Sequence, residues 1–409
     1  RETIGSYTNN LRNKQLNYDA SKLEDLQGGI KETHTEPIFV LNLATSSLES
    51  QLEMLRTARN LGMSVKYIEL GNEFYFDVSN YKRVFPSGAD YAQTASEWIV
   101  AIKQEFPAAK IALVGVAPKP KDSIREQNWQ KSLLNSAMYQ ADAVTLHLYN
   151  GHGLNSQIDS NSTYPFFSSE EVQLILGQPF RSWQKLQNND QLKLIPDNKQ
   201  IWITEYNLFE NVFGKKNRDK QQRVMGSWTH GLYALTMSLL FLEDSRIAIA
   251  CNHVLTGNSR FAAILANKGS FINPSDEDFR VKPKSLSATG STLSLLGEAT
   301  SGMIQGQKID FSPESTLVGK KNFEYPALYG WRFNDGKHSQ AIITNLSNQN
   351  IRINLEQIFS ASVSYQQFSA VPQTLITGNE VIKRKSDTVF PEIMLPAYSV
   401  TKLNSLRSF

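Results

Sequence analysis

The sequence predicts a large α/β domain, in which helices cover a parallel sheet, followed by a smaller all-β domain. Two observations support this prediction. Up to residue 298, short apolar runs alternate with segments whose apolar residues have helical spacing. From residue 299 on, the runs are short and alternating, with turn residues between them. We therefore expect an α/β domain over residues 1–298 and a β-sandwich over residues 299–409.

Six β-then-α units follow one another in the first domain. We predict strands at residues 37–43, 66–73, 110–117, 143–149, 199–207 and 247–255. We predict helices at residues 47–62, 90–107, 127–141, 169–187, 223–244 and 284–299. Strands this continuously apolar are typical of a parallel sheet that is buried on both faces. The chain has no complete G-x-G-x-x-G or G-x-x-x-x-G-K-[ST] motif, so a nucleotide-binding doubly wound fold has no positive support.

The second domain contains short runs of alternating polarity, separated by Asn-Asp-Gly, Ser-Asn-Gln-Asn and Thr-Gly-Asn turns. We predict strands in it at residues 325–333, 339–347, 350–355, 362–370, 380–386 and 400–405. Regularly spaced short strands of this kind predict a sandwich.

Composition excludes several classes of protein. The net charge is only +3 and the basic residues are scattered, which argues against a nucleic-acid partner. No apolar run is long enough to cross a membrane, and the first residues contain no signal-peptide core. Cys251 is the single cysteine, so no internal disulfide forms. Sequons at Asn161 and Asn345 are compatible with a secreted, extracellular or periplasmic protein, which is the location we expect.

Two predicted strands run into a glutamate: "YIELGNE" ends at Glu73, and "IWITE" ends at Glu205. In a (β/α)₈ barrel the carboxyl ends of the strands carry the active site. Two carboxylates that face one pocket are typical of glycoside hydrolysis, where one donates a proton and the other attacks the anomeric carbon. A single glutamate after a strand is about as often a surface or capping residue, but a pair in two such motifs favours catalysis.

These motifs resemble those of a known group of enzymes. Gly71-Asn72-Glu73, His147-Leu148-Tyr149 and Thr204-Glu205 are similar to motifs of the clan A retaining glycoside hydrolases, whose fold is a (β/α)₈ barrel. With the C-terminal "LPAYSVTKL", the layout most resembles the heparanase and β-glucuronidase branch, and the α-L-arabinofuranosidase branch is the nearest competitor. Phe74 stands where the heparanase branch usually has proline, a departure that concerns the substrate more than the chemistry.

The resemblance implies a role for each motif residue. Glu73 would be the general acid/base and Glu205 the nucleophile of a double displacement. Asn72 would bind the 2-hydroxyl of the sugar, and Tyr149 would donate a hydrogen bond to the nucleophile. His147 would bridge sugar hydroxyls or orient a glutamate. The alternatives are a satisfied core histidine for His147 and a core aromatic for Tyr149.

Further residues are candidates for substrate binding. Asn42 ends the first strand, although a turn residue is as good an interpretation. The remaining candidates are Tyr75, Phe76, Tyr206 and Trp228 for stacking on sugars, and Asn252 and His253 at the end of the last strand. Most such aromatic residues are simply core. The six histidines form no metal-binding motif, so we expect neither a catalytic metal nor a cofactor.

Only six strands are visible, whereas the barrel needs eight. The resemblance puts Glu73 on the fourth strand, so the first two strands are missing, and residues 18–32 have a helical pattern. We expect that a cleaved N-terminal peptide or a second chain completes the barrel, or that the segment is absent from this sequence. Two other functions stay open: a glycosidase acting on neutral sugars, such as an arabinofuranosidase, and a non-enzymatic carbohydrate-binding protein on a decayed glycosidase scaffold.

Overall fold

The computed structural model describes residues 23–117, 119, 121–133, 137–151, 167–209, 223–257, 262–265, 285–312 and 315–405. The chain divides into two compact units. Unit 1 comprises residues 1–147, 188–204 and 246–249, and unit 2 comprises residues 148–187, 205–245 and 250–409. The division passes through three strands, which therefore begin in unit 1 and end in unit 2. The sequon at Asn161 lies outside the described residues.

A parallel sheet of six strands contains the six strands predicted from the apolar runs. Its strands follow one another in chain order: β1 (Ile38–Val40), β2 (Tyr67–Glu69), β3 (Lys110–Val114), β4 (Ala143–Asn150), β5 (Gln200–Leu208) and β6 (Ile247–Asn252). The registers from β1 to β4 are all parallel. Strands that are both consecutive in sequence and adjacent in space need a crossover between each pair, which the helices provide.

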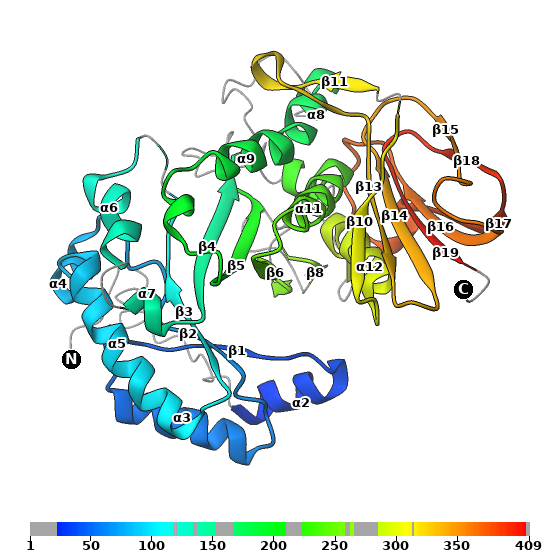
Figure 1. The fold of residues 1–409 in the computed structure, drawn as a ribbon. Coiled ribbons are helices and arrows are strands. Elements are labelled where there is room, and N and C mark those ends of the chain that lie inside the picture. The colour runs from blue at the N-terminus through cyan, green and yellow to red at the C-terminus, as the bar shows by residue number, and fades with distance from the viewer. Residues whose placement is uncertain are drawn as a thin grey trace, which may run out of the picture. The chain divides into compact units, whose positions relative to one another are not determined.

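The helices between these strands in unit 1 are α3 (Leu48–Asn60), α4 (Ser79–Val84), α5 (Gly88–Glu105), α6 (Ile124–Leu133) and α7 (Ala137–Gln140), preceded by α2 (Leu23–Thr33). Figure 1 shows α3 and α5 lying along one side of the first strands. Helix α5 illustrates how the sequence defines its ends: Ser87 and Asp90 form a capping box at the start, and Pro107 follows just beyond the last turn.

The sheet is curled. A cluster of apolar side chains in unit 1 takes one residue from each strand, namely Ile38, Tyr67, Ala112, Ala143, Trp202 and Ile249. The rings of Tyr67 on β2 and Trp202 on β5 meet edge to face, with centroids 5.5 Å apart. In a flat sheet these two strands would be about 14 Å apart, at about 4.8 Å for each strand spacing. Side chains from strands that are not neighbours therefore meet on the concave face of the sheet, as they do inside a barrel.

Unit 2 contains the helices α8 (Ser169–Leu176), α9 (Gln178–Gln187), α11 (Trp228–Phe241) and α12 (Ala288–Thr300), and the short strands β7 (Thr256–Gly257), β8 (Ile264–Leu265) and β9 (Ser285–Leu286). The single helix predicted at residues 169–187 is two helices. Gly177 caps the first of them, and Pro179 lies in the first turn of the second, where its missing N–H is tolerated. Helix α12 packs beside β14 and β19 of the C-terminal sheet, as Figure 1 shows for β14.

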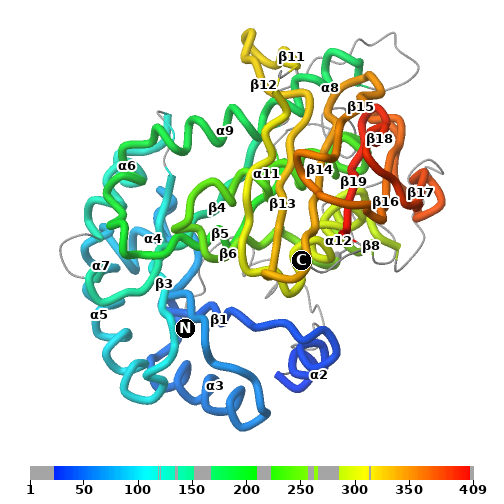
Figure 2. The backbone as a smooth tube through the Cα atoms, turned by 45° about the vertical axis from the view of Figure 1, so that its right-hand side comes forward, coloured from blue at the N-terminus to red at the C-terminus, as the bar shows by residue number. Residues whose placement is uncertain are grey.

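The C-terminal part of unit 2 is antiparallel, as predicted. Its main sheet has the order β10 (Gln305–Lys308), β13 (Leu328–Asn334), β14 (Ser339–Asn345), β19 (Ser399–Ser405), β16 (Val363–Ser369) and β17 (Lys383–Val389). Figure 2 shows four of these strands, β13, β14, β19 and β16, side by side. The smaller sheets are β11 (Thr316–Val318) with β12 (Glu324–Pro326), and β15 (Ile351–Asn354) with β18 (Glu392–Leu395). One apolar core joins β13 and β14 to β15 and β18, so the two sheets pack face to face.

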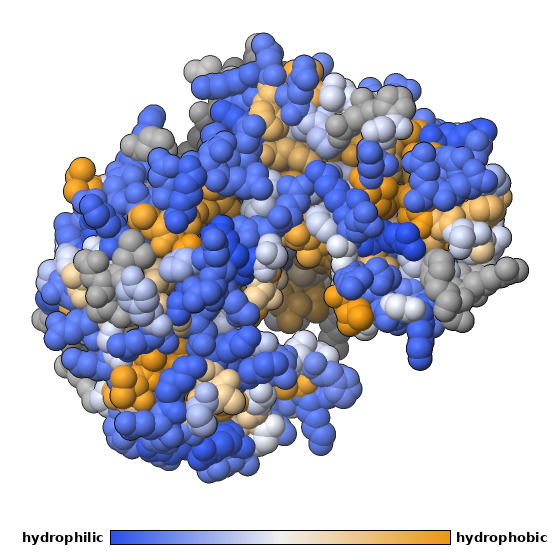
Figure 3. Space-filling model, in the orientation of Figure 1, coloured by the Kyte–Doolittle hydropathy of each residue, from blue (hydrophilic) through white to orange (hydrophobic). Residues whose placement is uncertain are grey.

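No helix among the described residues has the length and hydropathy of a membrane span. The face drawn in Figure 3 is mainly hydrophilic, with small groups of hydrophobic side chains between the polar ones. The sequon at Asn345 is not available to a glycan, because Asn345 is buried and its amide donates to the carbonyls of Gln349, Leu395 and Pro396.

Candidate active site

The turn after β2 carries Glu73. The strand ends at Glu69, earlier than its apolar run suggests, because Gly71 has φ 110° and Glu73 has φ 52°. Two left-handed residues turn the chain away from the sheet. Glu73 therefore lies in a sharp turn just beyond the carboxyl end of the strand, with 22% of its side chain exposed.

Contacts on both sides of Glu73 fix this turn. Before it, the buried Tyr91 hydroxyl donates to the Leu70 carbonyl at 2.9 Å and accepts from the Val114 N–H at 2.8 Å. After it, a guanidinium N–H of Arg125 donates to the Phe74 carbonyl at 2.8 Å. Each of these backbone groups would otherwise be left without a partner in a poorly solvated place. The backbone that holds Glu73 is thus tied to the strand β3 and to the helices α5 and α6.

Phe74 occupies the position where the resembling branch usually has proline. Phe74 is 5% exposed, and its ring packs against Phe85 and Tyr91, with centroids 5.0 Å and 5.8 Å away. A proline would fix the backbone at this position through its own ring. Here the turn is held instead by aromatic packing.

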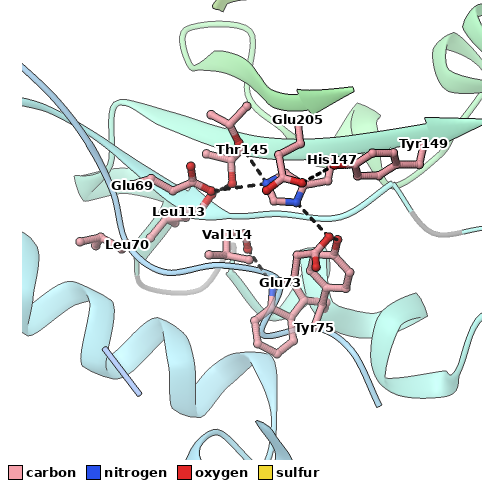
Figure 4. A network of polar contacts seen from close by, with 12 residues as sticks. Glu69, Leu70, Glu73, Tyr75, Leu113, Val114, Thr145, His147, Tyr149 and Glu205 are labelled. Carbon is pink, nitrogen blue, oxygen red and sulfur yellow. Dashed lines mark hydrogen bonds and ion pairs between the residues drawn. The ribbon is translucent and has the colours of Figure 1, made fainter. Parts of the chain in front are cut away.

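Glu73 has two hydrogen-bond partners in unit 1. Nδ1 of His147 lies 2.9 Å from Oε1 of Glu73, and the Tyr75 hydroxyl donates to the same oxygen at 3.3 Å (Figure 4). The other ring nitrogen of His147, Nε2, is 3.1 Å from Oγ1 of Thr204. His147 on β4 therefore connects the turn after β2 with the middle of β5. An imidazole at this distance from a carboxyl can exchange or stabilise a proton on it.

Glu69 is a polar member of this group that the sequence interpretation did not single out. It is 2% exposed, and its Oε1 lies 3.8 Å from Nε2 of His147. Its charge has a second effect nearby: burial raises the pKa of Tyr91, and the negative charge of Glu69 raises it further. The signal was present in the sequence, since a glutamate inside an apolar strand that is buried on both faces requires a partner.

Glu205 lies on β5 in unit 2 with a separate set of partners. The Tyr149 hydroxyl donates to Oε2 of Glu205 at 2.5 Å, and the same hydroxyl oxygen is 2.9 Å from Nδ1 of His253. Tyr149 has only one proton to donate, and an ionised carboxylate can only accept. Nδ1 of His253 must therefore carry a hydrogen and donate it to Tyr149. The Tyr149 hydroxyl thus accepts a hydrogen bond from His253 and donates one to Glu205.

Asn207, also missed from the sequence, supports His253. Its side-chain amide donates to the backbone carbonyl of His253, and its Oδ1 accepts from Nε2 of the buried His230 at 2.6 Å. Asn252, beside His253, donates to the Tyr206 carbonyl at 3.1 Å. The end of β6 is thus tied to β5 through side-chain amides.

Two predicted stacking residues are unsuited to that role. Tyr206 is 2% exposed, packs against Phe241, and bonds Ser238 through its hydroxyl at 2.6 Å. Trp228 is fully buried and donates its ring N–H to the Tyr398 carbonyl. Both belong to the core of unit 2, because α11 covers this side of β5.

The remaining candidates lie in unit 1. Asn42 is exposed, and its side chain bonds the Ala44 and Thr45 backbone, which is the turn role considered above. Asn72 is exposed in the turn beside Glu73. Tyr75 is buried against Phe76, with ring centroids 4.8 Å apart, and Phe76 is 38% exposed.

The chain was compared with protein-family models, curated protein sequences and solved structures. No protein-family model and no curated protein sequence matches the chain. Among solved structures, it is similar to a family 51 α-L-arabinofuranosidase from Bifidobacterium longum, with a TM-score of 0.68, 14% identity, and coverage of 93% of this chain and 78% of that one. The chain has the fold of a glycosidase.

Two further structures extend the comparison. The thermostable family 51 α-L-arabinofuranosidase from Thermotoga petrophila gives a TM-score of 0.62 at 16% identity, covering 93% of this chain and 78% of that one. A 4-O-α-L-rhamnosyl-β-D-glucuronidase from Fusarium oxysporum gives 0.57 at 13% identity, covering 93% and 79%. At such identities the likeness concerns the fold and leaves the substrate open.

Proposed function

We propose that the chain is a retaining glycoside hydrolase in which Glu73 is the general acid/base and Glu205 the nucleophile. One observation carries this proposal. His147, which bonds Glu73, and Tyr149, which bonds Glu205, are two residues apart on β4. Side chains two apart leave a strand on the same face. We therefore infer that the two carboxylates act on one substrate.

The reaction runs in two displacements. In the first, Glu205 attacks the anomeric carbon, the glycosidic C–O bond breaks, and Glu73 gives its proton to the departing oxygen. In the second, Glu73, now a carboxylate, takes a proton from a water molecule. The oxygen of that water bonds the anomeric carbon and releases Glu205, so the configuration is retained.

The partners described above fit these roles. The phenol O–H of Tyr149 is a short donor to Glu205 at 2.5 Å and aims its oxygen. His147 orients Glu73 and bonds the carboxylate that forms once Glu73 has given up its proton. Asn72, in the turn beside the acid, is our proposed ligand for the sugar 2-hydroxyl, a contact that strengthens in the transition state. His253 acts through Tyr149.

We propose further that the parallel sheet is part of an eight-stranded (β/α)₈ barrel, with the catalytic domain ending at residue 298 and a β-sandwich from residue 299. The consecutive strand order and the cluster shared by all six strands support this. Glutamates at the carboxyl ends of strands are also typical of the catalytic face of such barrels.

For the substrate we favour α-L-arabinofuranosides, or related neutral glycosides in an oligo- or polysaccharide, over the heparanase-like reading of the sequence. Family 51 α-L-arabinofuranosidases are the similar structures with TM-scores of 0.68 and 0.62, whereas the glucuronidase gives 0.57. A polysaccharide substrate also fits a secreted or periplasmic location.

A panel of p-nitrophenyl glycosides tests this proposal: arabinofuranosides, xylosides, glucosides and glucuronides. We expect turnover of the α-L-arabinofuranoside, and NMR of the first product should show the retained anomer. Preference for the glucuronide would restore the heparanase-like branch. Binding of sugars without turnover of any member would instead indicate a decayed scaffold.

Two substitutions then assign the carboxylates. Glu205→Gln should abolish turnover with the fold intact, as circular dichroism would report. Glu73→Gln should slow substrates with poor leaving groups far more than nitrophenyl glycosides, because only the former need a proton donor. Glu53→Gln is the matched control, since Glu53 is 67% exposed on α3 and should leave activity unchanged. Full activity of Glu205→Gln would refute the assignment.

A further inference from the structure

A buried glutamate behind the proposed acid/base has no role in the mechanism above. Glu69 is 2% exposed, whereas carboxylates almost never occupy such positions without a partner. An ionised carboxylate out of water costs several kcal/mol unless a positive group or several donors compensate it. The ring of His147, with a side chain that is 4% exposed, is within ion-pair distance at 3.8 Å.

Both ring nitrogens of His147 face oxygen atoms: the ionised carboxylates of Glu73 and Glu69 can only accept, whereas the Thr204 hydroxyl can accept or donate. Nδ1 meets Glu73 at 2.9 Å, and Nε2 meets Thr204 at 3.1 Å with Glu69 just beyond. A neutral imidazole carries one N–H and can donate on one side only, whereas the imidazolium donates on both. The order carboxylate, imidazole, carboxylate is visible in Figure 4.

We propose that Glu69 is a positioning residue whose buried charge keeps His147 protonated on both ring nitrogens and thereby strengthens Glu73 as an acid. This inference rests on the proposed function only for its catalytic consequence. A buried carboxylate behind an imidazole orients the ring and stabilises its charged form, which is how the aspartate of a serine-protease triad works.

The protons balance in each step. When the glycosidic bond breaks, the proton of Glu73 moves to the leaving oxygen, and the new carboxylate faces the charged Nδ1–H of His147. That charge-assisted hydrogen bond stabilises the carboxylate as it forms. His147 and Glu69 keep their protonation states throughout. In the second displacement Glu73 regains its proton from the attacking water.

Three tyrosines and Glu205 are other titratable groups close to Glu69, His147 and Glu73. Tyr75 donates to Glu73, and burial together with the Glu73 charge raises the pKa of Tyr81 on α4. The pKa of Tyr91 on α5 is raised by burial and by the negative charge of Glu69. Because their pKa values are raised, Tyr81 and Tyr91 stay neutral at the pH at which the enzyme would be assayed. Glu205 follows Thr204 in the chain and is the other carboxylate whose ionisation a pH–rate profile reports.

The first test needs no substrate. NMR of the chain labelled with ¹⁵N-histidine, with His147 assigned through His147→Gln, reports whether both ring nitrogens carry protons. We expect the imidazolium at pH 7 in the wild type, the neutral ring in Glu69→Gln, and no change in the control Glu53→Gln. A neutral His147 in the wild type overturns the proposal, whether or not Glu69→Gln folds.

The second test measures kinetics on alkyl and nitrophenyl glycosides. Glu69→Gln should lose about 10-fold in kcat/KM on the alkyl glycoside, a part of the 10²- to 10⁴-fold that acid catalysis contributes, and under 2-fold on the nitrophenyl one. In Glu69→Gln, which lacks the imidazolium, the alkaline limb of the pH–rate profile should move to higher pH by about one unit. Equal losses on both substrates, or an unmoved limb, would show a merely structural role. If the wild type cleaves no glycoside, the proposed function fails, while the NMR result still decides the role of Glu69.

Discussion

Gly71 is the position in the turn of Glu73 where one added methyl group should do most harm. Its φ of 110° is rarely adopted by residues with side chains, and left-handed backbone costs an L-residue about 1–2 kcal/mol. A Cβ at this position would lie 2.0 Å from Cε2 of Phe74 and 2.7 Å from Cζ. Phe74 has little room to retreat, because Phe85 and Tyr91 pack against its ring.

The magnitude for Gly71→Ala follows from these two terms. Backbone strain contributes about 1–2 kcal/mol, and overpacking against a fixed ring adds about 1–3 kcal/mol. The free energy of unfolding should therefore fall by about 2–5 kcal/mol relative to the wild type. Since Glu73 is two residues further on, turnover of glycosides should fall as well, even at temperatures where the variant is folded.

Gly62→Ala is the matched control. Gly62 also has a positive φ, 83°, but a Cβ there meets no atom within 4 Å, so only the strain term applies. Urea denaturation of the two variants separates strain from packing, and turnover should be unchanged in Gly62→Ala. Equal losses of stability in the two variants, with turnover intact in both, would refute the account of the Gly71–Phe74 contact.

Two further substitutions test other contacts. Tyr149→Phe removes the donor to Glu205 and should lower kcat by about 10- to 100-fold, as expected for loss of a hydrogen bond to a charged group, with thermal stability nearly unchanged; an unchanged kcat would count against the role of Tyr149. Burial opposes ionisation of Glu243, but hydrogen bonds from Lys308, Tyr329 and Trp183 outweigh it and hold the pKa of Glu243 below its usual value. The stability that ionised Glu243 contributes to the fold is complete above about pH 4.3, its pKa in the unfolded chain. It is lost as the pH falls through the lower pKa of Glu243 in the folded protein. The wild type should thus be more stable than Glu243→Gln at pH 6, and this advantage in urea midpoint should shrink towards pH 3; a constant difference would contradict the linkage.

The sequence predicted the parallel sheet well because each of its strands is a local run of apolar residues. It failed where pairing alone makes a strand. β10 (Gln305–Lys308) is polar and exposed along its whole length, and it is a strand because it pairs with β13. The break of the helix at Gly177 was also missed, since helical periodicity continues across it.

The candidate site was predictable only in part. Glu73 and Glu205 stand out through short motifs, and the resemblance supplied His147 and Tyr149. The face of Tyr206 could not be predicted, because β5 is buried on both sides and its sequence lacks the alternation that would distinguish them. Asn207 depends on a partner far along the chain, which no local pattern reveals. Glu69 was detectable as a charge inside an apolar strand, but its partner His147 is equally distant in sequence.

Glu73 has a left-handed backbone conformation, with φ 52°. This conformation lowers the stability of the fold at a residue that the proposed reaction requires. Glycine or asparagine adopts this conformation at less cost, so exchanging Glu73 for either should stabilise the protein by about 1 kcal/mol while removing the proposed acid. A scaffold selected only to bind sugars would gain from that exchange. The proposed role of Glu73 as the acid accounts for a glutamate in this strained turn, and consensus-style thermostabilisation of the chain should leave residues 71–74 untouched.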